Sequence, residues 1–349
     1  MYDPVDLAFA YGAPIASGVF KASTDDFKVD ERLGFELSGA GEHLFLRVEK
    51  RGLNTEELVK RLAMTLNKPV KSISYAGLKD RLALTTQWLS VHCPGEDIPD
   101  ASSLEGNQWR VIQSGRHLKK LKKGGLESNL FTMVLRDLTH HEDIEHRLAC
   151  IKAHGVPNYF GPQRFGHHGQ NIQKAEDMLL KGKRVKDRFL RGLYYSTARS
   201  FLFNRILSER VAHRNWNRVI PGDVVQLAGT HSVFCATTPD HAMQERATNH
   251  DLSPASTLWG KGNELVRCDA LIMQQTSLTD LEPWCRALEQ HELIRAYRAH
   301  VLCAQHMTWV WQDANLVLSF ELTAGSFATS VLRELIATLS ASPHQIHTQ

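Results

Sequence analysis

The chain has 349 residues, of which 42% are hydrophobic and 23% charged, and its formal net charge is +3 at pH 7. This length favours two domains, and no apolar run is long enough to cross a membrane. The six cysteines are scattered without a Cys-x-x-Cys pair, which argues against a zinc ribbon or a disulfide framework. Together with an acidic N-terminus that lacks an export signal, they predict a cytoplasmic protein.

The first third of the chain predicts strands around one helix. Alternating residues predict strands at 27–30 and 44–48. Asn54-Thr55-Glu56-Glu57 has the form of a capping box, and apolar residues every fourth position predict a helix that ends before Pro69. Strands are then predicted before Gly77 and over 84–91.

The remaining elements mix helices and strands without a regular βαβ rhythm. We expect strands at 109–112, 130–135 and 316–322, and short strands and loops over 215–265. Helices are expected near 144–154, 171–181, 194–214, 286–306 and 331–339. The irregular order predicts an α+β fold, and the change in character after Gly155 suggests an insertion or a second domain.

The run Ser74–Arg81 places a carboxylate between two cations on a turn. Lys79 and Arg81 flank Asp80, and nearby positive charge favours an ionised carboxylate. Such a residue can serve as a nucleophile or general base. The alternative is a merely polar hairpin turn, because Gly, Asp and Lys are common in turns.

Positive charge is concentrated in two tracts. Between Lys181 and Arg218 there are eleven Lys or Arg residues against two acids, and a second tract covers residues 116–123. Acid-poor tracts of this kind suit a polyanion such as nucleic acid, although each tract alone could be a solvated helix face. The predicted RNA contacts are Lys79, Arg81, Lys119, Lys120, Lys122, Lys123, Arg164, Arg184, Arg188 and Arg191.

A second dense motif covers residues 156–169, where glycines and prolines bracket two aromatic residues, Gln163 and Arg164. It could be a ligand loop or a rigid turn, and it lacks the Gly-Lys-Ser/Thr ending of a phosphate-binding P-loop. The eighteen histidines raise the question of a metal site. His300, Cys303 and His306 are spaced by three on the predicted helix, but no fourth ligand has zinc-like spacing, so we expect no metal.

Four segments together resemble the TruD family of tRNA pseudouridine synthases. They are Phe27-x-Val29-x-Glu31, residues 76–81, residues 158–166 and Gly325-Ser326-Phe327-Ala328-Thr329. The resemblance spans nearly the whole chain in the family's order. It implies a pseudouridine-synthase catalytic domain, with a mixed, mainly antiparallel sheet and flanking helices, formed by residues 1–154 and 304–349. An α/β TRUD domain would be inserted over 155–303.

The same resemblance implies the residues of the site. Asp80 would be the catalytic aspartate and Lys21 a basic residue beside it. Phe131 would stack on the target uracil, with Phe27, Asn129 and Phe327 completing the base pocket. The implied activity is isomerisation of a uridine of tRNA, uridine 13 in the family, without a cofactor. The implied partner is tRNA, and no membrane or obligate protein partner is indicated, so a monomer is expected.

Two other functions remain open at this stage. A non-catalytic RNA-binding protein or RNA chaperone would use the same basic tracts, and a metal-dependent nuclease or hydrolase would use the histidines. Whether Asp80 attacks C1′, attacks C6 or removes a sugar proton is also left open by the residues alone.

Overall fold

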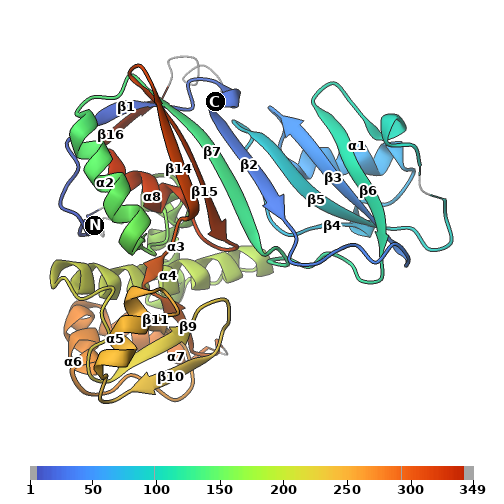
Figure 1. The fold of residues 1–349 in the computed structure, drawn as a ribbon. Helices are drawn as coiled ribbons and strands as arrows, with labels where there is room; N and C mark the ends of the chain where they lie inside the picture. Colours follow the sequence, from blue (N-terminus) through green and yellow to red (C-terminus); the bar gives the residue numbers. More distant parts are fainter. Residues whose placement is uncertain (1–5, 98, 292, 342–349) are drawn as a thin grey trace. The chain divides into compact units, whose positions relative to one another are not determined.

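The computed structural model describes residues 6–97, 99–291 and 293–341 (Figure 1). The acidic segment 1–5 and residues 342–349 lie outside this description. The chain folds into two compact units. Unit 1 takes residues up to 14, 145–303 and 327–335, and unit 2 takes 15–144, 304–326 and those from 336 onward. The division between residues 144 and 145 falls inside the helix α2 (His141–His154).

Unit 2 is built on a ten-stranded sheet in which the main path runs β14-β15-β7-β2-β5-β3-β6. β1 pairs with β7 and β16, and β4 pairs with β5. Among the described residues only β1–β16 and β2–β5 are parallel pairs. The bounds are β1 Ser17–Phe20, β2 Phe27–Arg32, β3 His43–Arg51, β4 Ile73–Tyr75, β5 Leu84–His92, β6 Trp109–His117, β7 Ser128–Arg136, β14 Gln305–Gln312, β15 Asn315–Thr323 and β16 Thr338–Ala341. The predicted mixed, mainly antiparallel sheet is confirmed.

The helix α1 (Thr55–Thr65) covers part of this sheet because its apolar residues share one face. Leu58 and Leu62 are fully buried in a cluster with Leu44, Leu46 and Leu89 of the sheet. The expected capping box is not formed, since the side chain of Asn54 makes no cap hydrogen bond. Thr55 is buried, and its hydroxyl donates to Oε1 of Gln87 at 2.9 Å.

Unit 1 combines helices with a second sheet, ordered β10-β9-β11-β12 and antiparallel throughout. Besides most of α2, its elements are β8 Val156–Pro157, α3 Gln170–Leu179, α4 Arg188–Ala212, β9 Asp223–Leu227, β10 Val233–Ala236, α5 His241–Thr248, β11 Leu252–Leu258, α6 Cys268–Ser277, α7 Glu282–Glu289, β12 Ala296–Ala299, β13 Val301–Leu302 and α8 Ala328–Leu335. The α+β class expected from the sequence is confirmed.

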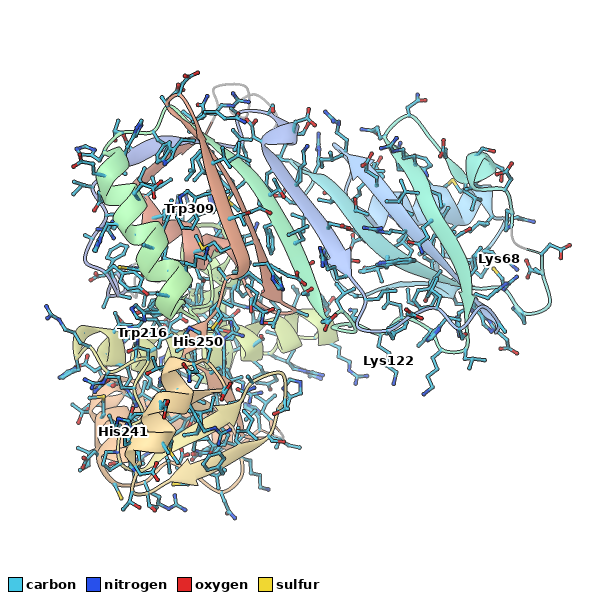
Figure 2. The ribbon with its side chains drawn as sticks, viewed as in Figure 1. Lys68, Lys122, Trp216, His241, His250 and Trp309 are labelled. Atoms are coloured by element: carbon cyan, nitrogen blue, oxygen red, sulfur yellow. The ribbon has the colours of Figure 1, made fainter. Side chains whose placement is uncertain are left out.

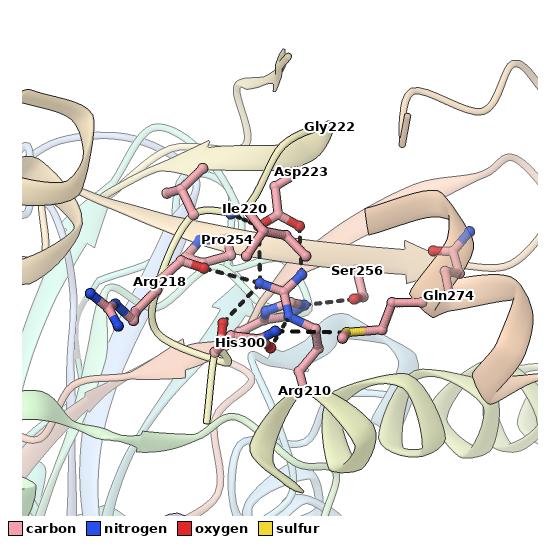
Figure 3. A network of polar contacts seen from close by, with 12 residues as sticks. Arg210, Arg218, Ile220, Gly222, Asp223, Pro254, Ser256, Gln274 and His300 are labelled. Carbon is pink, nitrogen blue, oxygen red and sulfur yellow. Dashed lines mark hydrogen bonds and ion pairs between the residues drawn. The ribbon is translucent and has the colours of Figure 1, made fainter. Parts of the chain in front are cut away.

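A buried polar network joins α4 to the small sheet of unit 1 (Figure 3). Nη1 of Arg210 lies 2.6 Å from Oδ1 of Asp223, and both side chains are almost fully buried. His300 shares a 2.6 Å hydrogen bond with the hydroxyl of Ser256. Burial holds the pKa of His300 well below its usual value, so the imidazole is neutral.

Two predicted helices are wrong in part. The helix expected over 286–306 ends at Glu289, and the chain continues as β12 and β13. β12 pairs with β11, and β13 pairs with β8. Strand partners that are distant in sequence therefore give this segment its β conformation in place of a helix. His300, Cys303 and His306 consequently do not share a helix. The final helix ends at Leu335 rather than near 339, where β16 pairs with β1.

Candidate active site

Asp80 lies in the loop that joins β4 to β5 in unit 2. Two buried side chains hold this loop in place. The hydroxyl of Thr55 accepts a hydrogen bond from the backbone N–H of Lys79 at 3.0 Å. Nζ of Lys50, which is 1% exposed, donates to the carbonyls of Asp80 at 3.1 Å and Leu53 at 2.7 Å. Contacts with α1 and β3 therefore fix the position of Asp80, in addition to the pairing of β4 with β5 on either side of the loop.

The carboxylate of Asp80 forms an ion pair with Lys21, which directly follows β1. Both side chains are partly exposed, at 28% for Asp80 and 18% for Lys21. The backbone of Lys21 has a φ of +58°, a left-handed conformation that costs about 1–2 kcal/mol for a residue with a Cβ. The second carboxylate oxygen of Asp80 accepts a hydrogen bond from the N–H of Leu82 at 2.9 Å.

These contacts decide the ionisation of Asp80. Burial is the largest single influence and would raise its pKa, but the hydrogen bond and charge of Lys21 and the N–H of Leu82 outweigh it. The pKa of Asp80 is therefore below its ordinary value. Burial also lowers the pKa of Lys50 to about 8, although the charge of Asp80 opposes this shift. At neutral pH the site presents an ionised carboxylate that keeps some access to solvent.

A row of phenylalanines lies beside this ion pair. Nζ of Lys21 is 4.4 Å from the ring centroid of Phe27. Phe27 is stacked with Phe131, with centroids 6.1 Å apart, and Phe131 lies 5.7 Å from Phe320. Strand register explains the row, because Phe131 on β7 pairs with Val29 of β2 on one side and Phe320 of β15 on the other. Phe27 and Phe131 are each 8% exposed, whereas Phe320 is fully buried.

Lys79 is tied to the sheet. Its Nζ lies 2.6 Å from Oε1 of Glu31 and donates to Oδ1 of Asn129 at 3.0 Å. Glu31 and Asn129 are register partners on β2 and β7. The side chain of Lys79 is only 10% exposed. Lys79 and Asn129 thus hold the Asp80 loop against the sheet. Of the two cations that flank Asp80, Lys79 and Arg81, only Arg81 is exposed.

The other predicted residues of unit 2 are the lysines at 119, 120, 122 and 123, all of which are exposed after β6. The remaining predicted residues belong to unit 1. Phe327 lies 6.3 Å from Phe160 between ring centroids. Nη1 of Arg164 donates to the hydroxyl of Ser196 at 3.2 Å, and burial lowers the pKa of Arg164. Arg184, Arg188 and Arg191 are exposed at or just before the start of α4.

Within the described ranges, no three His, Cys, Asp or Glu side chains are grouped so that they could hold a metal ion. The same part of the chain contains no helix that is both long and apolar enough to cross a membrane.

Comparison with known proteins identifies the family. The family model described as tRNA pseudouridine synthase D (TruD) matches residues 7–186 and 170–335. The chain belongs to the TruD family. It is 47% identical to the tRNA pseudouridine synthase D of Legionella pneumophila (strain Corby), over 95% of this chain and 98% of that protein. It is 42% identical to the same enzyme of Methylococcus capsulatus, over 95% of this chain and 94% of that protein.

A solved structure shares the fold. A Methanosarcina mazei chain assigned to tRNA pseudouridine synthase D matches with a TM-score of 0.71 at 20% identity, covering 97% of this chain and 96% of that one. At this identity the likeness supports the TruD fold alone. It agrees with the α+β architecture described above.

Three residues of this candidate site received no role from the sequence. Lys50 lies in a strand whose other inward-facing residues are apolar, and Glu31 lies at an inward position of β2. A charged residue at an inward strand position is the signal that could have revealed both. Phe320 was visible only as one apolar residue of an alternating strand, and its place beside Phe131 depends on the pairing of β7 with β15.

Proposed function

We propose that this protein converts a uridine of tRNA to pseudouridine, with uridine 13 as the target and Asp80 as the catalytic carboxylate. The observation that carries the proposal is the ionised Asp80 paired with Lys21, whose ammonium lies over the ring of Phe27, which in turn is stacked with Phe131. Family membership supports the reaction class.

The reaction is an isomerisation. The N1–C1′ bond of uridine breaks, the uracil turns, a C5–C1′ bond forms, N1 gains a proton and C5 loses one. No electron donor or acceptor is consumed. The chain must supply an anionic group near the sugar and base and a surface that retains the detached uracil, and an aromatic face is suited to holding an unstacked base.

The residues of unit 2 match these needs. Lys21 keeps Asp80 ionised, and an ionised carboxylate can act as a nucleophile at C1′ or C6, or as a base toward the sugar. Phe27 and Phe131, each of which is 8% exposed, would supply an apolar contact for uracil. Lys50 and Thr55 hold the Asp80 loop, so the carboxylate is positioned before substrate arrives.

We also propose a division of labour between the two parts of the chain. Asp80, Lys21, Phe27 and Phe131 all lie in unit 2, which we assign to the catalytic domain. The exposed Arg184, Arg188 and Arg191 lie in unit 1, within the segment 155–303 that we assign to the inserted domain. There they would contact RNA phosphates. Phe189, between two of these arginines, is 73% exposed and offers a ring for base stacking.

The deciding experiment measures tritium release from tRNA whose uridines carry tritium at C5, because isomerisation expels that hydrogen. We expect release of one equivalent per tRNA, and loss of the signal when position 13 is changed to cytidine. Binding of tRNA without tritium release would instead support an RNA-binding or chaperone function.

A further inference from the structure

Unit 2 contains a cavity that the proposed reaction does not use. Its volume is about 560 Å³, within the range of small-ligand pockets. It is walled by α1, by the segment around β4 and by the loop that follows β6. Neither Asp80 nor Lys21 lines it.

The charge of this cavity is strongly positive. Five lysines line it against one acid, Glu56, and the lysines are Lys60, Lys71, Lys120, Lys122 and Lys123. All five are exposed, and the ion pairs found within the described residues include none of them. Figure 2 shows the side chain of Lys122 projecting from the surface. Cations that lack carboxylate partners and converge on one hollow favour an anionic ligand.

The cavity wall is apolar between these lysines. Val59, Ile73 and Leu121 are buried residues of the wall, and Tyr75 is half-buried. Val70, which also lines the cavity, is 49% exposed, so its side chain is available for contact with a ligand. An apolar wall bordered by ammonium groups suits a nucleotide, whose base is apolar on its faces and whose phosphates are anionic.

The cavity is joined directly to the Asp80 loop. The N–H of Gly124 donates to the carbonyl of Ala76 at 2.9 Å, and the N–H of Leu121 donates to the hydroxyl of Ser90 at 3.0 Å. Tyr75 is the last residue of β4, and Asp80 follows it by five positions along the chain, a span of at most about 18 Å. An RNA strand held at the cavity would therefore have its neighbouring nucleotides close to the catalytic loop.

We propose that this cavity binds a nucleotide of tRNA other than the target uridine. The base lies against Val70 and Tyr75, and the flanking phosphates contact Lys71, Lys122 and the other lysines of the cavity. This inference rests on the proposed function, since it assumes that tRNA is the substrate. It adds an anchoring site that sets which stretch of the RNA faces Asp80.

The first test compares two double variants of equal charge. K71A/K122A removes two lysines of the cavity, and K174A/K261A removes two exposed lysines of unit 1. For K71A/K122A we expect tRNA binding about tenfold weaker and the slope of log K against log salt smaller by about 1.5, because two phosphate contacts are lost. The Michaelis constant for tRNA rises while turnover at saturating tRNA is unchanged. K174A/K261A behaves as the parent protein.

The second test locates the base and uses the unaltered protein. tRNA that carries 4-thiouridine is irradiated in complex with it, and cross-links are expected on the peptide containing residues 70–75. If K71A/K122A binds tRNA as the parent does and the cross-links map elsewhere, the cavity is not an RNA site, while tritium release still upholds the proposed function. If the parent protein neither binds tRNA nor releases tritium, the proposed function fails and the inference fails with it.

Discussion

Nζ of Lys79 lies 2.6 Å from Oε1 of Glu31, a carboxylate whose side chain has no exposed surface. Oε2 of the same carboxylate accepts a hydrogen bond from the N–H of Trp88 at 2.7 Å. The pair therefore connects β2, β5 and the loop that carries Asp80. Because Lys79 directly precedes Asp80, the geometry of the loop that carries Asp80 depends on this buried contact.

We expect Glu31→Gln to lower the free energy of unfolding by about 3–5 kcal/mol, because it leaves Lys79 nearly buried without its carboxylate. Urea denaturation measures this change. The double variant E31Q/K79M removes both charges and should recover a large part of the loss, whereas equal destabilisation of the single and double variants would show that the pair has no special role.

Asp80→Asn should reduce tritium release on the order of 10³-fold or more while tRNA affinity stays within about threefold, since the substitution removes the charge and keeps the shape. Single-turnover release and filter binding give the two quantities. A parallel loss of binding would mean that Asp80 serves structure rather than catalysis.

Lys21→Met should change the pH dependence of the reaction. The pKa of Asp80 is below its ordinary value of 3.8, so Asp80 stays ionised, and active, as the pH falls to about 4. Removing Lys21 leaves burial as the main influence and raises the pKa of Asp80, which should move the acid limb of the rate profile to higher pH. Lys28→Met, at an exposed lysine of β2, is the matched control and should leave the acid limb in place. An unmoved limb in Lys21→Met would refute the role assigned to the pair.

Phe131→Leu should cost about 1–2 kcal/mol of stability and reduce turnover by about tenfold to a hundredfold, because it removes the aromatic ring that we propose contacts the uracil. Phe320→Leu is the control. That ring lies beside Phe131 but is fully buried, so it should cost similar stability with much less effect on turnover. Equal loss of turnover in both variants would assign Phe131 to the core alone.

Asp26 should give the fold a measurable acid dependence. It is 2% exposed and accepts two hydrogen bonds from Arg136, at 2.7 and 2.9 Å, and these contacts are the main cause of its lowered pKa. The ionised form therefore stabilises the fold above pH 4, and this contribution is lost as the pH falls from about 3.8 through the lower folded-state pKa.

Asp26→Asn should accordingly lower the free energy of unfolding by about 2 kcal/mol at pH 7 and by less at pH 3, as measured by denaturation at both pH values. Its neighbour Asp25 pairs with Arg51 at the surface, where both side chains are about half exposed. Asp25→Asn should cost less than about 1 kcal/mol. Similar costs at both pH values for Asp26→Asn would contradict the assignment.

The sequence by itself determined the class of fold, the elements with strong local periodicity and the motifs around Asp80. The apolar face of α1 is predicted by the spacing of its own apolar residues, and the strands containing Phe27, Phe131 and Phe320 are predicted by alternation within each segment. The family resemblance rests on four such local motifs, and the comparisons confirm it.

Tertiary structure decided what depends on partners distant in the chain. Residues 296–302 are strands because β11 and β8 offer free edges, although their spacing also fits a helix. Likewise, the local pattern around Asp80 shows only a charged turn. The family resemblance implied that Lys21 lies beside Asp80, and the folded structure shows how the two residues meet across 59 positions of the chain. The ion pair, the burial of Lys79 against Glu31 and the aromatic row all arise from strand register. Register is set by long-range pairing, and no single segment of the chain carries that information.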